Sequence, residues 1–428
     1  MTLDLSYLLN PTVLWALAAI ICMTAASAIM GTFTLLRKQA LIGDAISHAI
    51  LPGICLAFMI TQTKHPLVLM LGATLSGFLG LLAINYLSQR TKLKSDASLA
   101  LVLSVFYGLG IVLLTAIQRS GNAAQAGLDK FLFGKAAALM QEDTITFAVF
   151  GLILIAIVGV LFKPFKWITF DRDFAQSQGL PVRPLELLLS ILTVSAIALG
   201  IQAVGVVLMA ALLIAPAAAA RYWTHDLGWM LGLAVLFAIL SGVLGVYVSA
   251  TFPRMPLGPW IVSFLSIFAI GSVILGRKKG ILSNYQKRLR NQRKMRRENI
   301  LKCLWHLGEP TGQFYQARSI EEIQKRRYIP HNELKKGING LIKKGAIKAE
   351  NGGFVLTASG KKAGERIVRI HRLWELYLTT YLNLPADHVH EDAEAIEHII
   401  TPEIEKELEL QLAYANEDPH ASPIPYRD

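Results

Sequence analysis

Long apolar runs dominate the first 276 residues of the chain. A bilayer core about 30 Å thick needs about 20 apolar residues of helix, because each residue rises about 1.5 Å. The pattern predicts an all-α polytopic membrane protein with about nine transmembrane helices. The apolar runs lie at approximately 12–36, 44–61, 66–88, 97–118, 144–162, 186–203, 204–221, 227–251 and 258–276.

Basic residues in the polar breaks indicate how these helices are oriented. With the C-terminus in the cytoplasm, the inside loops hold ten Lys or Arg residues and the outside loops hold five. Because cytoplasmic loops carry an excess of Lys and Arg, we expect nine spans with the N-terminus outside and the C-terminus in the cytoplasm. The segment Gly127–Met140 is too short to span and is predicted to be interfacial or re-entrant.

Beyond residue 297 the pattern becomes that of a soluble domain. Apolar residues recur at helical spacing in three successive segments, and Ile347–Leu356 then alternates as a β-hairpin would. Helix, helix, helix and hairpin is the order of a winged helix, whose third helix enters the major groove of DNA. The candidate DNA-binding residues on that third helix are His331, Asn332, Lys335, Lys336 and Lys343.

Charge divides the chain further. The net charge of +12 is distributed as +5 over residues 1–276, +10 over 277–297 and −3 over 298–428. This excludes a uniformly basic nucleic-acid coat and a single soluble enzyme. Residues 277–297 are interpreted as a juxtamembrane linker that attracts anionic lipid, in preference to a nucleic-acid arm.

The small net charge of residues 298–428, called the tail below, is the sum of two larger charges of opposite sign. Residues 298–372 carry +8 and residues 373–428 carry −11. The first part suits phosphates, so 298–372 is predicted to be the winged helix-turn-helix domain. The second suits cations, so 373–428 is predicted to be a metal-binding and dimerisation region.

Asp44 and His48 are the strongest candidates for metal chemistry within the membrane. They lie four residues apart in GDAISHAILPG, so both side chains project from one helix face. Ionisable residues inside spans are costly and therefore functional candidates. A carboxylate and an imidazole suit Mn²⁺, Fe²⁺ or Zn²⁺. The alternative is an Asp cap beside a hydrogen-bonded interfacial His.

Two further segments hold candidate residues. The loop Asp171–Pro184 is predicted to form a short helix, broken at Gly179 and Pro181, that either docks on a partner or simply connects two spans. In the tail, His371 and Glu375 form an i, i+4 pair, and Glu394, Glu397 and His398 follow on successive turns. Such groups can hold a divalent ion, although acidic helices with exposed His are common.

Five runs in order, MGTFTLLRKQALIGDAISHAILPG, DKFLFGKAAAL, FDRDFAQSQGLPVRPLELLL, QAVGVVLMAALLIAPAAAAR and PLGPWIV, resemble the permease subunits of ABC importers for manganese, zinc and iron. The resemblance covers residues 10–276. It implies a homodimeric or heterodimeric channel, an extracytoplasmic metal-binding protein and a separate ATPase subunit, so that this chain is not an enzyme. The resemblance also implies that Asp44 and His48 line the path of the metal ion. It implies that the segment coupled to the ATPase subunit contains Asp171, Phe174, Ala175, Gly179, Leu180 and Pro181.

No phosphate loop accompanies these features. The nearest segment, ASGKKAG at Ala358–Gly364, lacks the first glycine of GxxxxGK[ST] and has Lys362 where Ser or Thr binds Mg²⁺. We therefore expect no ATP to be bound by this chain.

The run from GLIKKGAI to DPHASPIP resembles the iron- and manganese-dependent repressors of the diphtheria-toxin-repressor type, over about 298–425. The resemblance implies one metal site at His371, Glu375 and His390 and another at Glu394, Glu397 and His398. The first helix departs from the family, with Asn299 where a ligand is expected and Lys302 where manganese-type members have Glu. A protonated lysine is no ligand, so the second site is incomplete, shifted to Glu298 or weaker.

The tail therefore has three interpretations. It is a metal-dependent repressor tethered to the permease or released from it, a brake that binds incoming metal and closes the permease, or a degenerate dimerisation module. The sequence does not choose among Mn²⁺, Fe²⁺ and Zn²⁺, because the Asp, His and Glu set suits all three.

Overall fold

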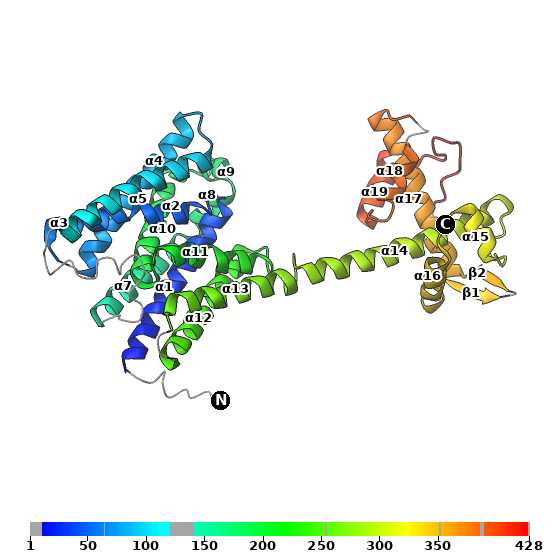
Figure 1. The fold of residues 1–428 in the computed structure, drawn as a ribbon. Coiled ribbons are helices and arrows are strands. Elements are labelled where there is room, and N and C mark those ends of the chain that lie inside the picture. The colour runs from blue at the N-terminus through cyan, green and yellow to red at the C-terminus, as the bar shows by residue number, and fades with distance from the viewer. Residues whose placement is uncertain are drawn as a thin grey trace. The chain divides into compact units, whose positions relative to one another are not determined.

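The computed structural model describes residues 11–63, 65–119, 141–252, 255–350, 352–385 and 389–426. The chain divides into two compact units, Met1–Asn284 and Tyr285–Asp428 (Figure 1). The predicted segment Gly127–Met140 lies outside the described residues.

The first unit is built from helices only, within the part that the structure describes. Their bounds are α1 (Pro11–Leu36), α2 (Ile42–Ala49), α3 (Leu51–Thr61), α4 (Pro66–Arg90), α5 (Ser95–Arg119), α7 (Gln141–Val160), α8 (Phe162–Phe170), α9 (Arg172–Ser177), α10 (Val182–Val204), α11 (Val206–Arg221), α12 (Leu227–Thr251) and α13 (Leu257–Leu275).

Each of the nine predicted apolar runs corresponds to helix in the structure, which confirms the fold class. Among the described residues, seven helical segments are long and apolar enough to cross a membrane, and the bent pair α7 and α8 makes an eighth. That pair turns by 71° between Val160 and Phe162. The remaining run, α11, is a shorter apolar helix because Gly205, with φ of 88°, interrupts it from α10.

The helices differ in how deeply they are buried within the unit. The segment α2–α3 and helix α10 are the most enclosed, whereas α5 and α13 expose most of their surface. Apolar residues such as Val112 and Ile267 cover the exposed faces, as expected of helices in contact with lipid. The enclosed helices pack through small residues. A Cβ at Gly53 would lie 2.0 Å from the carbonyl oxygen of Gly72 on α4, so α3 and α4 approach backbone to backbone there.

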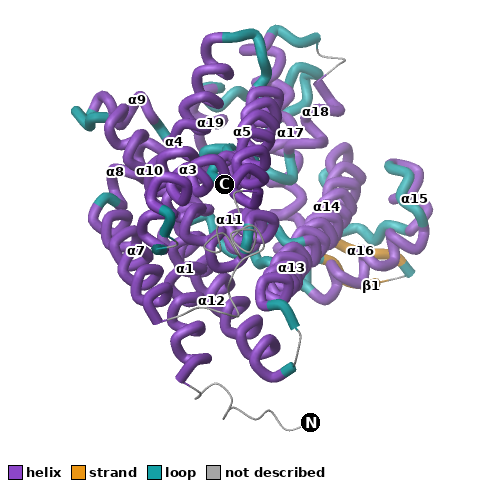
Figure 2. The backbone as a smooth tube through the Cα atoms, turned by 60° about the vertical axis from the view of Figure 1, so that its left-hand side comes forward, coloured by secondary structure: helices purple, strands orange, loops and turns teal. Residues whose placement is uncertain are grey.

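The second unit contains helices and one β-hairpin, drawn in orange in Figure 2. Strands β1 (Ile347–Glu350) and β2 (Gly353–Leu356) are antiparallel, with Ile347 opposite Leu356. A further bridge pairs Arg318 with Phe354 beside the hairpin. The other elements are α14 (Ile281–Gly308), the 3₁₀ turn η4 (Glu309–Thr311), α15 (Ile320–Arg326), α16 (His331–Lys343), α17 (Ala358–Leu382), α18 (Val389–Ile396) and α19 (Pro402–Gln411).

The predicted order of three helices and a hairpin is present as α14, α15, α16, β1 and β2. Helix α14 begins earlier than predicted, at Ile281, so that most of the basic linker is helical. The segment 281–307 lacks Gly and Pro and is rich in Lys, Arg, Gln and Leu, which favour helix. Apolar side chains of these elements form one core, with Ile300, Leu304, Leu334, Ile338 and Leu341 among its buried members.

Candidate metal-binding sites

Asp44 and His48 lie on one face of α2, as the spacing predicts. The Nε2 atom of His48 is 3.8 Å from Oδ1 of Asp44. The imidazole packs edge-on against the Tyr107 ring of α5, with 4.9 Å between ring centroids. The Nδ1 atom of His48 is buried and has no hydrogen-bond partner among the described residues. The Asp44 carboxylate and the Nε2 atom of His48 therefore lie side by side on this face of α2.

The backbone beside this pair stays helical. Helix α2 ends at Ala49 and α3 begins at Leu51, but Ile50 between them has helical φ and ψ of −72° and −28°, and Ile42–Thr61 forms one span. Pro52 has no N–H to donate to the carbonyl group of His48, so the helix lacks one backbone hydrogen bond at this point.

The side chain of Asp44 remains 51% exposed within the single chain. A half-exposed carboxylate inside a membrane span does not face lipid, because a charged side chain in hydrocarbon is too costly. This face of α2 must therefore border water or another protein chain.

The predicted coupling segment forms α9, six residues long. Asp171 caps it, since its side chain accepts a hydrogen bond from the Phe174 amide at 2.8 Å. Ala175 is fully buried, whereas Phe174 is 46% exposed and its ring lies edge-on against Trp167. Gly179 ends the turn with φ of 77°, and Leu180 and Pro181 lead into α10. The helix thus presents one aromatic side chain outward from a fixed turn.

Glu186, which the sequence analysis did not single out, connects α9 to its neighbours through ion pairs. Glu186 on α10 lies 3.4 Å from Arg172 of α9 and 3.9 Å from Arg37, which follows α1. All three line a cavity of about 290 Å³ that also contains Arg183. The sequence feature that could have revealed these ion pairs is a single acidic residue at the start of an apolar run, directly after a basic loop.

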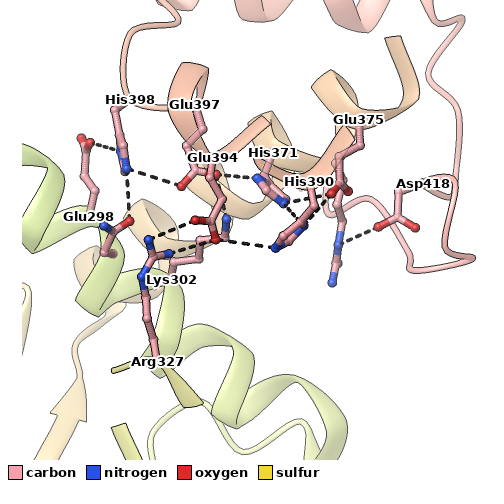
Figure 3. Close-up of polar contacts among 12 residues, drawn as sticks. Glu298, Lys302, Arg327, His371, Glu375, His390, Glu394, Glu397, His398 and Asp418 are labelled. Atoms are coloured by element: carbon pink, nitrogen blue, oxygen red, sulfur yellow. Dashed lines mark hydrogen bonds and ion pairs between the residues drawn. The ribbon is translucent and has the colours of Figure 1, made fainter. Parts of the chain in front are cut away.

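In the tail, His371, Glu375 and His390 come together from α17 and α18 (Figure 3). Glu375 Oε1 lies 3.1 Å from His371 Nε2 and 2.8 Å from His390 Nδ1, and the two nitrogens are 3.1 Å apart. Neighbouring ligands of an octahedral ion with bonds of about 2.1 Å are about 3.0 Å apart. The three atoms therefore fit one face of such an ion's coordination shell.

The charges of this group are strongly coupled. Burial would raise the pKa of Glu375, but hydrogen bonds from His371 and His390 outweigh it and lower the pKa to about 2. Burial would likewise lower the pKa of His371, but the carboxylates of Glu375 and Glu397 raise it. Binding of a metal ion at Nε2 of His371 would therefore compete with binding of a proton there.

The structure does not bring the possible ligand atoms of the second predicted set as close together as those of the first. The second set is Glu394, Glu397 and His398. Among the described residues, only His371, Glu375 and His390 form a group of three possible ligands within 4.8 Å of one another. Glu394 is bound by both terminal nitrogens of Arg327, each at 3.0 Å. Glu397 is bound by Lys302 at 2.8 Å. In this arrangement Arg327 and Lys302 occupy the positions around Glu394 and Glu397, and the second metal site stays a prediction.

His398 is also engaged by other side chains. Its Nδ1 atom lies 2.8 Å from Glu298 Oε2, and its Nε2 atom lies 3.1 Å from Asn299 Oδ1. Both ring nitrogens thus face α14 (Figure 3).

Helix α16 places the predicted DNA-binding residues on one exposed face. Leu334, Ile338 and Leu341 occupy the opposite, buried face. A groove of about 770 Å³ runs between α16 and α14, and its lining includes Arg290, Arg293, Arg296, Arg297 and Lys336. The exposed residues are His331, Asn332, Lys335, Lys336 and Lys343.

The two parts of the chain match two known families. The chain belongs to the ABC 3 transport family, whose model matches residues 10–276. Residues 357–426 match the iron dependent repressor, metal binding and dimerisation domain. The protein is thus an ABC-family membrane permease with a repressor-like tail fused to it.

Individual relatives carry transport names. The chain is 39% identical to the manganese transport system membrane protein MntC of Bacillus subtilis, over 88% of this chain and 86% of that protein. It is 45% identical to the zinc transport system membrane protein TroC of Treponema pallidum, over 62% of this chain and 89% of that protein. The structure of PsaBC from Streptococcus pneumoniae in complex with Fab matches 64% of this chain and 96% of that chain, with 29% identity and a TM-score of 0.58.

The two relatives differ in how far the similarity extends. The Bacillus match spans 376 residues, far more than the permease unit alone, so it includes part of the tail. The Treponema match spans 264 residues and already accounts for 89% of that relative. The Treponema relative therefore has few residues outside the matched part, too few for a tail of this kind.

Proposed function

We propose that this chain is the permease subunit of an ATP-driven importer of first-row divalent metal ions, with Mn²⁺ or Zn²⁺ as the main cargo and Fe²⁺ as a further one. The observation that carries this proposal is the Asp44 and His48 pair on one face of α2, with the Asp44 side chain half-exposed. The names of the Bacillus and Treponema relatives support the same two metals.

The exposure of Asp44 favours a channel formed with a second permease subunit, identical or different. Two α2 faces brought together would enclose the carboxylates in a path for the ion. The proposal includes two further partners: an ABC ATPase subunit bound at α9, and an extracytoplasmic metal-binding protein on the opposite side of the membrane. It also places the tail in the cytoplasm, beneath the bacterial inner membrane.

We expect Phe174→Ser to lower uptake by about tenfold, because an exposed aromatic anchor is a typical source of interface energy. The assay is ATP-dependent uptake of ⁵⁴Mn²⁺ or ⁶⁵Zn²⁺ into vesicles that contain the permease, its ATPase subunit and its binding protein. Trp229→Ser is the matched control, since Trp229 is a 72% exposed aromatic outside α9. Wild-type uptake by the Phe174 variant would contradict the coupling role, and ATP-independent uptake would contradict the importer itself.

The tail is proposed to respond to metal through His371, Glu375 and His390. A second candidate function, binding of DNA, is favoured by the exposed basic face of α16 and by the arginine-lined groove beside it. The alternative role as a transport brake needs the metal site but not this face.

A gel shift with the full chain in detergent micelles separates these roles. For a DNA-binding tail, we expect Lys335→Glu with Lys336→Glu to weaken DNA binding by about tenfold, because phosphate contacts dominate such affinity. Lys406→Glu reverses one lysine charge in the acidic half, away from α16, and should leave binding unchanged. No salt-dependent shift by the wild-type chain, with or without Mn²⁺, would contradict DNA binding and leave the brake and the dimerisation module, of which only the brake requires bound metal.

A further inference from the structure

Two side-chain cations lie where the family's second metal ion would bind. Lys302 and Arg327 come from the winged-helix part of the tail, on α14 and at the end of α15. The carboxylates that they meet, Glu394 and Glu397, come from α18 and the turn that follows it. Figure 3 shows both cations pointing at these carboxylates.

The Lys302 pair is buried on both sides. The side chain of Lys302 is 6% exposed and that of Glu397 is fully buried, with 2.8 Å between Nζ and Oε2. Burying either charge alone would be strongly unfavourable, so the two stabilise each other only as a pair. Glu397 is thereby neutralised without any metal ion, and its pKa is lowered by His371 and Lys302 despite burial.

The Arg327 pair has the geometry of a strong ion pair. Its two terminal nitrogens each donate to a different oxygen of Glu394, at 3.0 Å. Such a bidentate contact fixes both partners in orientation as well as in charge. It leaves Glu394 oriented toward α15, with one oxygen 3.6 Å from His390.

Charge and distance together disfavour a metal ion at Oε2 of Glu397. The other oxygen, Oε1, is buried, has no hydrogen-bond partner among the described residues and lies 3.6 Å from His398 Nε2. The two side chains supply two positive charges, the same as a divalent ion. An ion bound about 2.1 Å from Glu397 Oε2 would lie within about 5 Å of the Lys302 ammonium, because that nitrogen is 2.8 Å from the same oxygen. Like charges that close in a buried place repel strongly.

We propose that Lys302 and Arg327 permanently replace the second metal ion, so that the tail binds one divalent ion, at His371, Glu375 and His390, and joins its winged-helix part to α18 without metal. This inference rests on the proposed metal-responsive tail. A glutamate at position 302 would be a ligand of the second metal ion. Lys302 instead takes the place of that ion.

The test counts the ions bound by the full chain. Purified protein in detergent micelles is dialysed against Mn²⁺, and bound metal is measured by mass spectrometry. The double variant His371→Ala with Glu375→Gln should lose one ion per chain relative to wild type. Lys302→Glu should gain one ion, because it exchanges the internal cation for a third carboxylate. Lys325→Glu is the matched control, since it makes the same charge change at an exposed position of α15 and should gain none.

A loss of two ions in the double variant would show that metal displaces Lys302 and would overturn the inference. No loss would instead contradict the proposed metal response of the tail. If Lys302→Glu fails to fold, hydrogen exchange of the wild-type chain decides. Protection of 300–304 and 394–398 should be the same in chelator and in Mn²⁺, and protection that depends on Mn²⁺ would overturn the inference.

Discussion

Replacement of Asp44 by Asn, or of His48 by Gln, is expected to lower metal uptake by about 100-fold while leaving the permease inserted and folded. Loss of groups that only orient a metal ligand already costs about 10- to 100-fold in affinity or activity, so loss of a ligand should cost at least the upper end. Both substitutions keep the size of the side chain, which limits their effect on packing around α2.

Two residues of the same types provide controls for this prediction. Asp96 lies exposed in the first turn of α5, where a carboxylate interacts with the helix dipole, so Asp96→Asn should transport normally. His65 is exposed directly before α4, and His65→Gln should also be neutral. The measurement is initial uptake of ⁵⁴Mn²⁺ per molecule of permease in vesicles. Normal uptake by both the Asp44 and His48 variants would remove the basis for a metal pathway at α2.

The largest effect on stability is expected at Arg369, which is 2% exposed in the tail. Its guanidinium contacts the buried carboxylate of Glu405, also lies 3.3 Å from Glu409, and donates to the Pro425 carbonyl at 3.1 Å. Arg369→Met leaves Glu405 with a weaker partner in a buried place. Breaking a buried ion pair in this way costs about 3–5 kcal/mol.

This loss should appear as local opening of the tail. Hydrogen exchange of α17 and α19 is expected to accelerate by about 100-fold or more, since each 1.4 kcal/mol corresponds to about tenfold in an opening equilibrium. Arg366 offers a control, because it pairs with the same carboxylate at 2.7 Å but its side chain is 37% exposed. Arg366→Met should change exchange much less. Equal acceleration in both variants would contradict the importance of burial at Arg369.

Local patterns were sufficient to predict the helices and their order. Runs of about 20 apolar residues predict spans whatever their partners are. The spacing of His371 and Glu375 predicts a shared helix face in the same way. The pattern placed the junction of α10 and α11 between residues 203 and 204, whereas the structure has it at the single residue Gly205. A glycine with positive φ changes direction within one residue.

Contacts between distant segments could not be predicted in this way. Lys302 and Glu397 are 95 residues apart in sequence, and Arg327 and Glu394 are 67 apart. No helical spacing connects them, and each pairing depends on how α18 packs beside α14 and α15. The unusual residue type at Lys302 was visible in the sequence. Its partner became visible only in the fold.

The two ion pairs that join the parts of the tail also bear on when the protein can be made. A permease that imports a metal ion has to fold before it can bring that metal into the cell. A domain whose folding required bound metal would then remain unfolded in the cells that most need the transporter. Lys302 and Arg327 are encoded in the chain itself, so the winged-helix part meets α18 in a newly made, metal-starved protein as readily as in a metal-replete one.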